Sequence, residues 1–267
     1  MQTDKELNLE RKKISSLVWE YSLPAIVGTL VNTLYNIVDR IFIGQGVGPM
    51  AISGLAITFP VTILASSLGL LVGVGAASRI SLSLGERRKD TAEKILGNSL
   101  LLTIAFNAIV MTLFYIYLDK ILIAFGATEN TLPYAREYLQ IVLIGNVFIS
   151  LCYSFNNMMR ASGYPQKAMV TMLIGAVLNI ILDPIFIFVV KLGSAGVAWA
   201  TVISMFVGMI FVMHHFVQEE STIKLKMKYI RFDKDIILAI VSIGMSPFLM
   251  QVAASGVAVL MNTSLIK

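Results

Sequence analysis

Charged residues are scarce in this sequence. Aspartate, glutamate, lysine and arginine make up 14% of the 267 residues, whereas 57% are apolar. A soluble globular domain carries about 25% charged residues. The mean hydropathy of +0.79 therefore excludes an ordinary soluble domain and predicts a protein embedded in a lipid bilayer.

Side chains that carry enzymatic chemistry are sparse as well. The one cysteine, Cys152, excludes an intrachain disulfide and is expected to be a small buried residue. The two histidines, His214 and His215, are adjacent, so a helix would not point both at one ion. The sequence has neither a Walker A glycine-lysine motif nor HExxH. Nucleotide hydrolysis and zincin chemistry are therefore unsupported, and no cofactor is expected.

Apolar segments long enough to cross a bilayer fill most of the chain. A window of about nineteen residues gives seven spans, at 15–43, 51–77, 95–118, 137–159, 168–190, 195–216 and 236–262. Each exceeds the length that a helix needs to cross a hydrocarbon core of about 30 Å. We therefore expect an all-α polytopic membrane protein that is not an enzyme.

Lysine and arginine gather on one side of these spans. Sixteen of them fall before the first span, after the second and fourth, and between the sixth and seventh. We expect a multi-pass protein of the plasma (bacterial inner) membrane, and the positive-inside rule predicts that its N-terminus is cytoplasmic. The same rule accounts for the basic cluster at 87–89, so no nucleic-acid partner is expected.

The first and seventh spans resemble each other. Pro24 precedes Asp39 by fifteen residues, and Pro247 precedes Asn262 by the same interval. The offset of 223 residues between the two prolines contains six spans, an even number, so both copies enter the membrane in the same direction, as in parallel repeats of secondary transporters. This pattern predicts an N-terminal segment at 1–14, a six-helix lobe at 15–218 and a cytoplasmic linker at 219–235. The helix at 236–267 would open a second lobe that the chain lacks, so it should pack loosely and expose an apolar surface.

The fifth span carries a polar group of residues at hydrocarbon depth. Asn179 and Asp183 are four residues apart and share one helix face. Pro184 lacks an N–H and clashes with the carbonyl of Ile180, which bends the helix and frees a backbone oxygen. A carboxylate is costly inside a membrane, so this group requires a partner or a function.

Topology places further oxygen atoms at the same depth. Asp39 lies near the outer end of the first span, and Thr201 lies in the outer half of the sixth. Taken alone, Asp39 could also be an interfacial acid; adjacent Arg40 points about 100° away on a helix and is not expected to screen it. Two carboxylates, an amide and a hydroxyl supply ligands for Na⁺, or a carboxylate pair that shares a proton.

The fourth span carries a polar stripe. Its members at helical spacing are Asn146, Ser150, Ser154 and Asn157, with Tyr153 and Asn156 beside them. Two interpretations stay open: hydrogen bonds between helices, or the lining of a substrate cavity.

The sequence resembles the multidrug and toxic compound extrusion (MATE) family at several motifs taken together. These are Pro24 with Leu34-Tyr35-Asn36-Ile37-Val38-Asp39, Arg79 with Gly85-Glu86, Met159-Arg160-Ala161-Ser162-Gly163-Tyr164-Pro165, Asn179-x3-Asp183-Pro184, and Gly196-Val197-Ala198-Trp199-Ala200-Thr201. The resemblance covers the whole chain but little more than half of a full family member.

The resemblance implies a fragment of a twelve-helix transporter, namely a MATE-type N-lobe plus the first helix of the C-lobe. Family members export organic cations and amphipathic drugs in exchange for Na⁺ or H⁺. The implied cation or proton site comprises Asp39, Asn179, Asp183, Thr201 and Tyr138, and a Na⁺ ion would sit at the first three. Pro24 would bend the first helix. The implied drug cavity would include Asn32, Tyr35, Asn36, Asn146, Ser150, Tyr153, Asn156 and Asn157.

Two alternatives remain. A lipid-linked oligosaccharide flippase of the same superfamily would line its cleft with basic residues, and the spans here are nearly free of interior lysine and arginine. An intramembrane aspartyl hydrolase would commonly carry Tyr-Asp and Gly-x-Gly-Asp, whereas the acids here read Val38-Asp39 and Leu182-Asp183. Both features favour the antiporter, whose partners would be the lipid bilayer, small-molecule drugs and the absent C-lobe.

Overall fold

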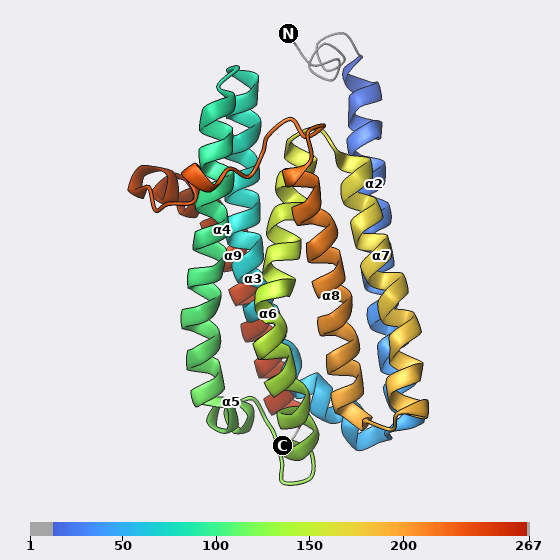
Figure 1. The fold of residues 1–267 in the computed structure, drawn as a ribbon. Helices are drawn as coiled ribbons and strands as arrows, with labels where there is room; N and C mark the ends of the chain where they lie inside the picture. The colour runs from blue at the N-terminus through green and yellow to red at the C-terminus, as the bar shows by residue number, and fades with distance from the viewer. Residues whose placement is uncertain (1–12, 266–267) are drawn as a thin grey trace.

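The computed structural model describes residues 13–265, so the predicted segment 1–14 lies almost wholly outside the described residues. Within that range the chain is helical and contains no strands (Figure 1). The elements in order are α2 (Ile14–Gly46), α3 (Pro49–Gly85), α4 (Lys89–Ile116), α5 (Leu118–Ala124), α6 (Leu132–Ala161), α7 (Pro165–Pro184), the π-helix η1 (Ile185–Val189), α8 (Gly193–Val217), the 3-10 helix η2 (Met227–Tyr229) and α9 (Lys234–Leu265).

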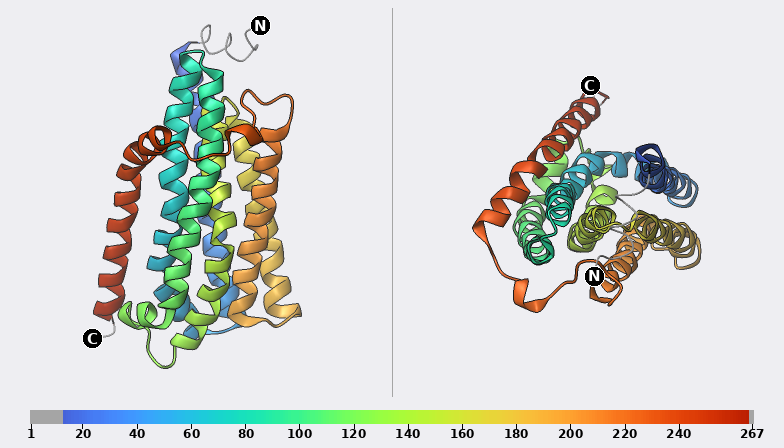
Figure 2. Two further views of the ribbon diagram at one scale, coloured as in Figure 1. Left: turned by 60° about the vertical axis from the view of Figure 1, so that its left-hand side comes forward. Right: turned by 90° about the horizontal axis from the view of Figure 1, so that it is seen from above.

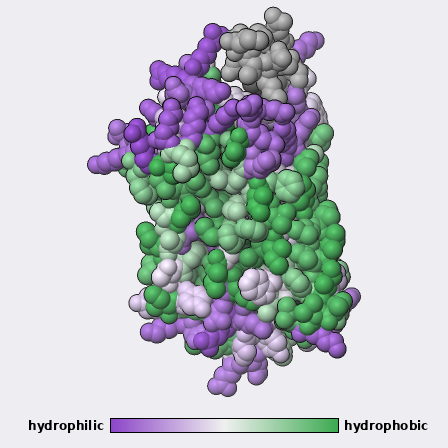
Figure 3. Space-filling model, in the orientation of Figure 1, coloured by the Kyte–Doolittle hydropathy of each residue, from purple (hydrophilic) through white to green (hydrophobic). Residues whose placement is uncertain are grey.

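Seven helical segments of the described chain are long and apolar enough to cross a membrane, and each overlaps one predicted span. This confirms the predicted fold class. The second helix continues to Gly85, well beyond the predicted end at 77, because a hydropathy window detects only the hydrocarbon-embedded part of a helix. An apolar belt separates two hydrophilic ends of the molecule (Figure 3).

The packing places α3 and α6 at the centre of a helical bundle. α8 packs on α6, α4 flanks α3 and α6, and α7 packs against both α2 and α8. Two glycines of α3 let its backbone touch the backbone of α6. A Cβ added at Gly69 would lie 2.8 Å from the backbone of Ser150, and one added at Gly73 would lie 2.8 Å from that of Ser154. Small residues of this kind are the usual means of close helix packing in membranes.

Helix α9 runs along α3 at the edge of the bundle (Figure 2). A Cβ added at Gly244 would lie 1.9 Å from the carbonyl oxygen of Leu71, and one at Gly75 would lie 2.0 Å from that of Ile240. The expectation of loose packing is therefore wrong along this contact. The exposed apolar surface predicted for this helix is present on its outer face, where Met250 and Leu260 are 70% and 67% exposed.

A proline in α3 creates a second tie to α9. Pro60 has no N–H, so the carbonyl of Ala56 loses its partner within the helix. The side-chain amide of Asn262 donates to that carbonyl oxygen over 3.2 Å, and the Ser255 hydroxyl donates to the carbonyl of Pro60 over 2.9 Å. Asn262 thus completes the backbone hydrogen bonding of α3, and Ser255 adds a second hydrogen bond between the two helices.

Candidate cation site and central cavity

A cavity of about 260 Å³ lies between α2, α3, α6 and α8. Four aromatic residues line it, together with one acid and one arginine from α2. The lining includes Tyr35, Asn36, Asp39, Arg40, Thr58, Phe59, Tyr138, Asn146, Tyr153, Thr201 and Gln251. The wall therefore combines ring faces with polar groups, which is the usual composition of a small-molecule site.

Of the two acids predicted from the sequence, Asp39 lines this cavity, whereas Asp183 is not among its lining residues. Asp183 and Asn179 on α7 are 0% and 1% exposed, and Asp39 on α2 is 9% exposed. α2 packs directly on α7, and the carboxyl groups of Asp39 and Asp183 interact with each other. Tyr138 of α6 lies within electrostatic reach of both acids, and Thr201 lines the same cavity.

The polar atoms of this cluster are poorly satisfied. Within residues 13–265, no donor or acceptor makes a well-formed hydrogen bond with either Asp183 oxygen, with Oδ1 of Asp39 or with the side-chain amide of Asn179. Buried polar groups nearly always have partners, and carboxylate and amide oxygens accept a cation or, for the acids, a proton. Carboxylate and amide oxygens are hard ligands that suit Na⁺, and a carboxylate pair can equally share one proton.

The backbone next to Asp183 is irregular. α7 ends at Pro184 and the chain continues as the π-helix η1. Because Pro184 lacks an N–H, the carbonyl oxygen of Ile180 is released from the helical pattern. Single π-helical turns of this kind are frequent at functional sites. The predicted helix-bending roles of Pro184 and Pro24, which lies inside α2, stay predictions.

The polar stripe of α6 divides between the cavity and its neighbours. Asn146 and Tyr153 line the cavity, as do Tyr35 and Asn36 of α2. Asn156 instead donates to the Ala168 carbonyl and to Thr171 on α7, at 2.8 and 2.7 Å. The cavity-lining role predicted for Asn156 is thus not what the structure shows. The side chain of Asn32 lies outside the described residues.

Ser150 and Asn157 also lie off the cavity. Ser150 donates to Oδ1 of Asn107 over 3.1 Å, and Asn157 donates to the carbonyl of Tyr153 in its own helix over 2.9 Å. Asn146 donates to the same Asn107 oxygen over 2.7 Å. Interhelical hydrogen bonding, the first of the two open interpretations, therefore accounts for Ser150. Asn146 makes such a bond and also lines the cavity, whose role in binding substrate stays a prediction.

Sequence reasoning missed three contributors to the site. Asn107 of α4 is 1% exposed and accepts the two hydrogen bonds just described; an asparagine in the apolar span 95–118 was a signal that could have revealed it. Arg40 was expected to face away, yet it lines the cavity with its guanidinium 5.5 Å from the ring centroid of Phe59. Gln251 of α9 reaches the cavity as well.

Comparison with known proteins identifies the family of this chain. The MatE family model matches residues 24–185, and the chain therefore belongs to the MATE family of transporters, which are not enzymes. It is 30% identical over 253 residues to a multidrug export protein, MepA, of Staphylococcus aureus, covering 95% of this chain and 56% of that protein.

Solved structures of similar transporters share the fold. One is an outward-facing conformation of a multidrug resistance MATE family transporter of the MOP superfamily, with a TM-score of 0.87 and 29% identity. Another, with the same TM-score and identity, is a MOP superfamily transporter from Pyrococcus furiosus, described as having a binding pocket of reverse polarity that suggests a different function. In both cases the match covers 94% of this chain and 56% of the other. The chain thus spans just over half the length of the relatives it matches.

Proposed function

We propose that this chain forms part of a secondary antiporter that exports organic cations and other amphipathic drugs in exchange for Na⁺ or H⁺. The observation that carries the proposal is the pair Asp39 and Asp183, buried together on α2 and α7 beside an aromatic cavity. Intramembrane acids with this placement are typical of ion-coupled transport.

Coupling follows from the charge on the acid pair. With both carboxylates ionised and no cation bound, their repulsion and burial disfavour close contact between α2 and α7. A bound Na⁺ or a shared proton removes that penalty. The ion therefore stabilises one packing of α2 against α7, and a gradient can bias which side the cavity faces.

The cavity wall supports a cationic, partly aromatic substrate. Tyr35, Phe59 and Tyr153 offer ring faces, which attract cations by their quadrupoles and bury apolar surface at the same time. Asp39 supplies the countercharge. A drug cation would then bind best when the acids carry a negative charge, whereas the coupling ion neutralises that charge. The two therefore compete for the same site, which is the thermodynamic requirement of exchange.

The test uses Asp183→Asn and Asp39→Asn in the full-length transporter. Each variant keeps shape and hydrogen-bonding capacity but loses the titratable charge, so expression should persist while gradient-driven efflux is lost. Because both acids serve one site, the double variant should be little worse than either single one. Asp119→Asn, an exposed acid paired with Arg136, is the matched control and should transport normally. Efflux is measured from vesicles under a Na⁺ or a pH gradient, and near-normal activity of either site variant contradicts the proposal.

Arg40 favours the lipid-linked oligosaccharide flippase as the second candidate, because it brings a cation into the cavity. The variant Arg40→Gln separates the two functions. An antiporter of organic cations should retain or gain cation efflux when this positive charge is removed, whereas a flippase that binds a phosphate through Arg40 should lose transport of its substrate.

A further inference from the structure

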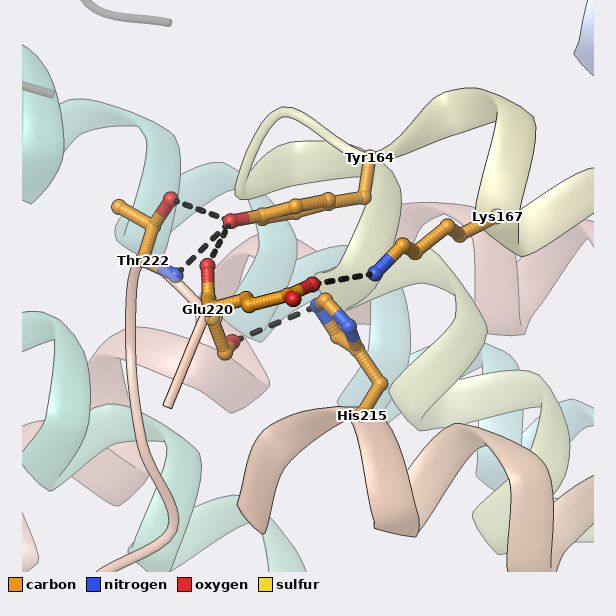
Figure 4. A network of polar contacts seen from close by, with 6 residues as sticks. Tyr164, Lys167, His215, Glu220 and Thr222 are labelled. Atoms are coloured by element: carbon orange, nitrogen blue, oxygen red, sulfur yellow. Dashed lines mark hydrogen bonds and ion pairs between the residues drawn. The ribbon is translucent and has the colours of Figure 1, made fainter. Parts of the chain in front are cut away.

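The linker between α8 and α9 begins with an anchored segment. The hydroxyl of Tyr164, at the start of α7, donates to the carbonyl of Glu220 over 2.6 Å and accepts the backbone N–H of Thr222 over 3.1 Å. Lys167 pairs with the Glu220 carboxylate at 3.6 Å (Figure 4). The first residues of the linker are therefore held against the bundle.

The middle of the linker is fastened to α4. Glu93, which is 0% exposed, lies 2.5 Å from Nζ of Lys226 and accepts the backbone N–H of Lys224 over 3.3 Å. The hydroxyl of Tyr229 donates to Asp90 over 3.1 Å. A Cβ added at Gly97 would lie 2.4 Å from the carbonyl oxygen of Tyr229, so the linker backbone rests directly on α4.

The end of the linker is equally fixed. Oδ1 of Asn98 accepts the backbone N–H of Asp233 over 2.7 Å. The Asp233 carboxylate accepts the N–H groups of Asp235 and Ile236, at 3.2 and 3.4 Å, which satisfies free donors at the start of α9. These contacts leave the intervening segment little freedom.

The segment 227–232 presents two kinds of side chain outward. Met227 and Phe232 are 84% and 62% exposed. Lys228 and Arg231 are also exposed, and the ammonium of Lys228 lies 4.5 Å from the ring centroid of Tyr229. Lys226 is already paired with Glu93, so Lys228 and Arg231 are the cations that this segment offers to a partner.

The position of the segment decides what that partner is. The linker joins the end of one membrane span, Val217, to the start of the next, Lys234, and it lies where the hydrophilic end of the molecule meets the apolar belt (Figures 1 and 3). Large apolar side chains flanked by cations at this level suit a lipid surface whose headgroups are negative. We propose that segment 227–232 is a binding site for anionic phospholipid, with Met227 and Phe232 in the acyl-chain boundary and Lys228 and Arg231 on the headgroup phosphates.

The experiment places a reporter within the site. Phe232→Trp is made in the 267-residue chain together with Trp19→Phe and Trp199→Phe, so that the introduced indole is the only one in these 267 residues. The protein is reconstituted in phosphatidylcholine bilayers with a fixed fraction of phosphatidylglycerol, and bromine is placed on the acyl chains of one lipid or the other. Quenching reports depth, and the ratio of the two quenching efficiencies reports enrichment of the anionic lipid.

We expect strong quenching and clear enrichment of phosphatidylglycerol over phosphatidylcholine. Lys228→Gln with Arg231→Gln should lower the enrichment by about fivefold for each cation removed and leave the indole quenched. Arg88→Gln with Lys89→Gln, at the α3–α4 turn, is the control and should change the ratio little. Met227→Trp in the same background provides a second reporter if the first variant misfolds.

Three results would overturn the proposal. An indole that neither brominated lipid quenches would place the segment in water. Equal quenching by both lipids in the parent would exclude headgroup selectivity. Loss of enrichment on adding millimolar glycerol phosphate would identify a site for free phosphate and not for lipid.

Discussion

The crossing of α3 and α9 gives a prediction with a definite sign. Gly75 and Gly244 each hold the partner helix so close that an added Cβ would lie 2.0 or 1.9 Å from a carbonyl oxygen. Real Cβ atoms do not approach within 3.0 Å. Gly244→Ala therefore forces the two helices apart by about 1 Å, and a gap of that size loses a quarter to a half of the dispersion energy of the atoms in contact.

The expected cost combines two opposing effects. Overpacking of this kind costs about 1–3 kcal/mol, and alanine recovers up to about 1 kcal/mol of helix propensity. We expect Gly75→Ala and Gly244→Ala each to destabilise the docking of α9 by about 1–2 kcal/mol. The double variant should cost less than the sum, because either substitution alone already separates the helices.

Gly256→Ala is the matched control on the same helix. No neighbouring atom lies within 4 Å of a Cβ added there, so this variant should be neutral or slightly stabilising. Hydrogen exchange of the α9 amides in lipid bilayers gives the opening free energy of each variant. If the α9 amides are as well protected from exchange in Gly244→Ala as in Gly256→Ala, the backbone contact with α3 does not hold the helix.

Two further predictions concern buried polar groups. Asn107→Leu removes the acceptor shared by Asn146 and Ser150. It should lower the free energy of unfolding, measured by detergent titration, by about 1 kcal/mol. The control Thr112→Val, which removes a hydroxyl bonded to the Ala108 carbonyl of the same helix, should leave that free energy unchanged. The hydrogen bond to Glu93 raises the pKa of Lys226 above its ordinary value of 10.5. The ion pair therefore stabilises the linker fully below pH 10.5 and is lost as the pH rises through the raised pKa. A dye attached through Met227→Cys in a Cys152→Ala background should accordingly gain mobility only at high pH, and Lys226→Met should abolish the transition.

Much of the architecture was predictable because each membrane helix must be apolar over the thickness of the bilayer. Apolar length alone locates seven helices, and chain direction then sets which residues share a depth. That reasoning brought Asp39, Asp183 and Thr201 to one level before any contact was known. The π-helix after Pro184 and the short helix α5 leave no signal in hydropathy, so they could not be predicted.

The remaining site residues depended on which helix faces which. Asn156 lies beside the polar stripe that contains Asn146, and it turns to α7 whereas Asn146 faces the cavity, because a helix in a bundle has neighbours all round. Arg40 reaches the cavity by extending over Phe59, a side-chain path that angular separation on a helix does not capture. The contact of Gly244 with Leu71 likewise required knowledge of the crossing point.

The proline of α3 has a consequence for biogenesis. Ala56 and the asparagine that donates to its carbonyl, Asn262, are 206 residues apart, so α3 enters the membrane long before its donor is synthesised. Until α9 arrives, the carbonyl of Ala56, one helical turn before Pro60, requires water or a temporary donor within the bilayer. An unsatisfied polar group costs several kcal/mol there. The first part of the second membrane helix is therefore completed late, by a residue near the far end of the described chain.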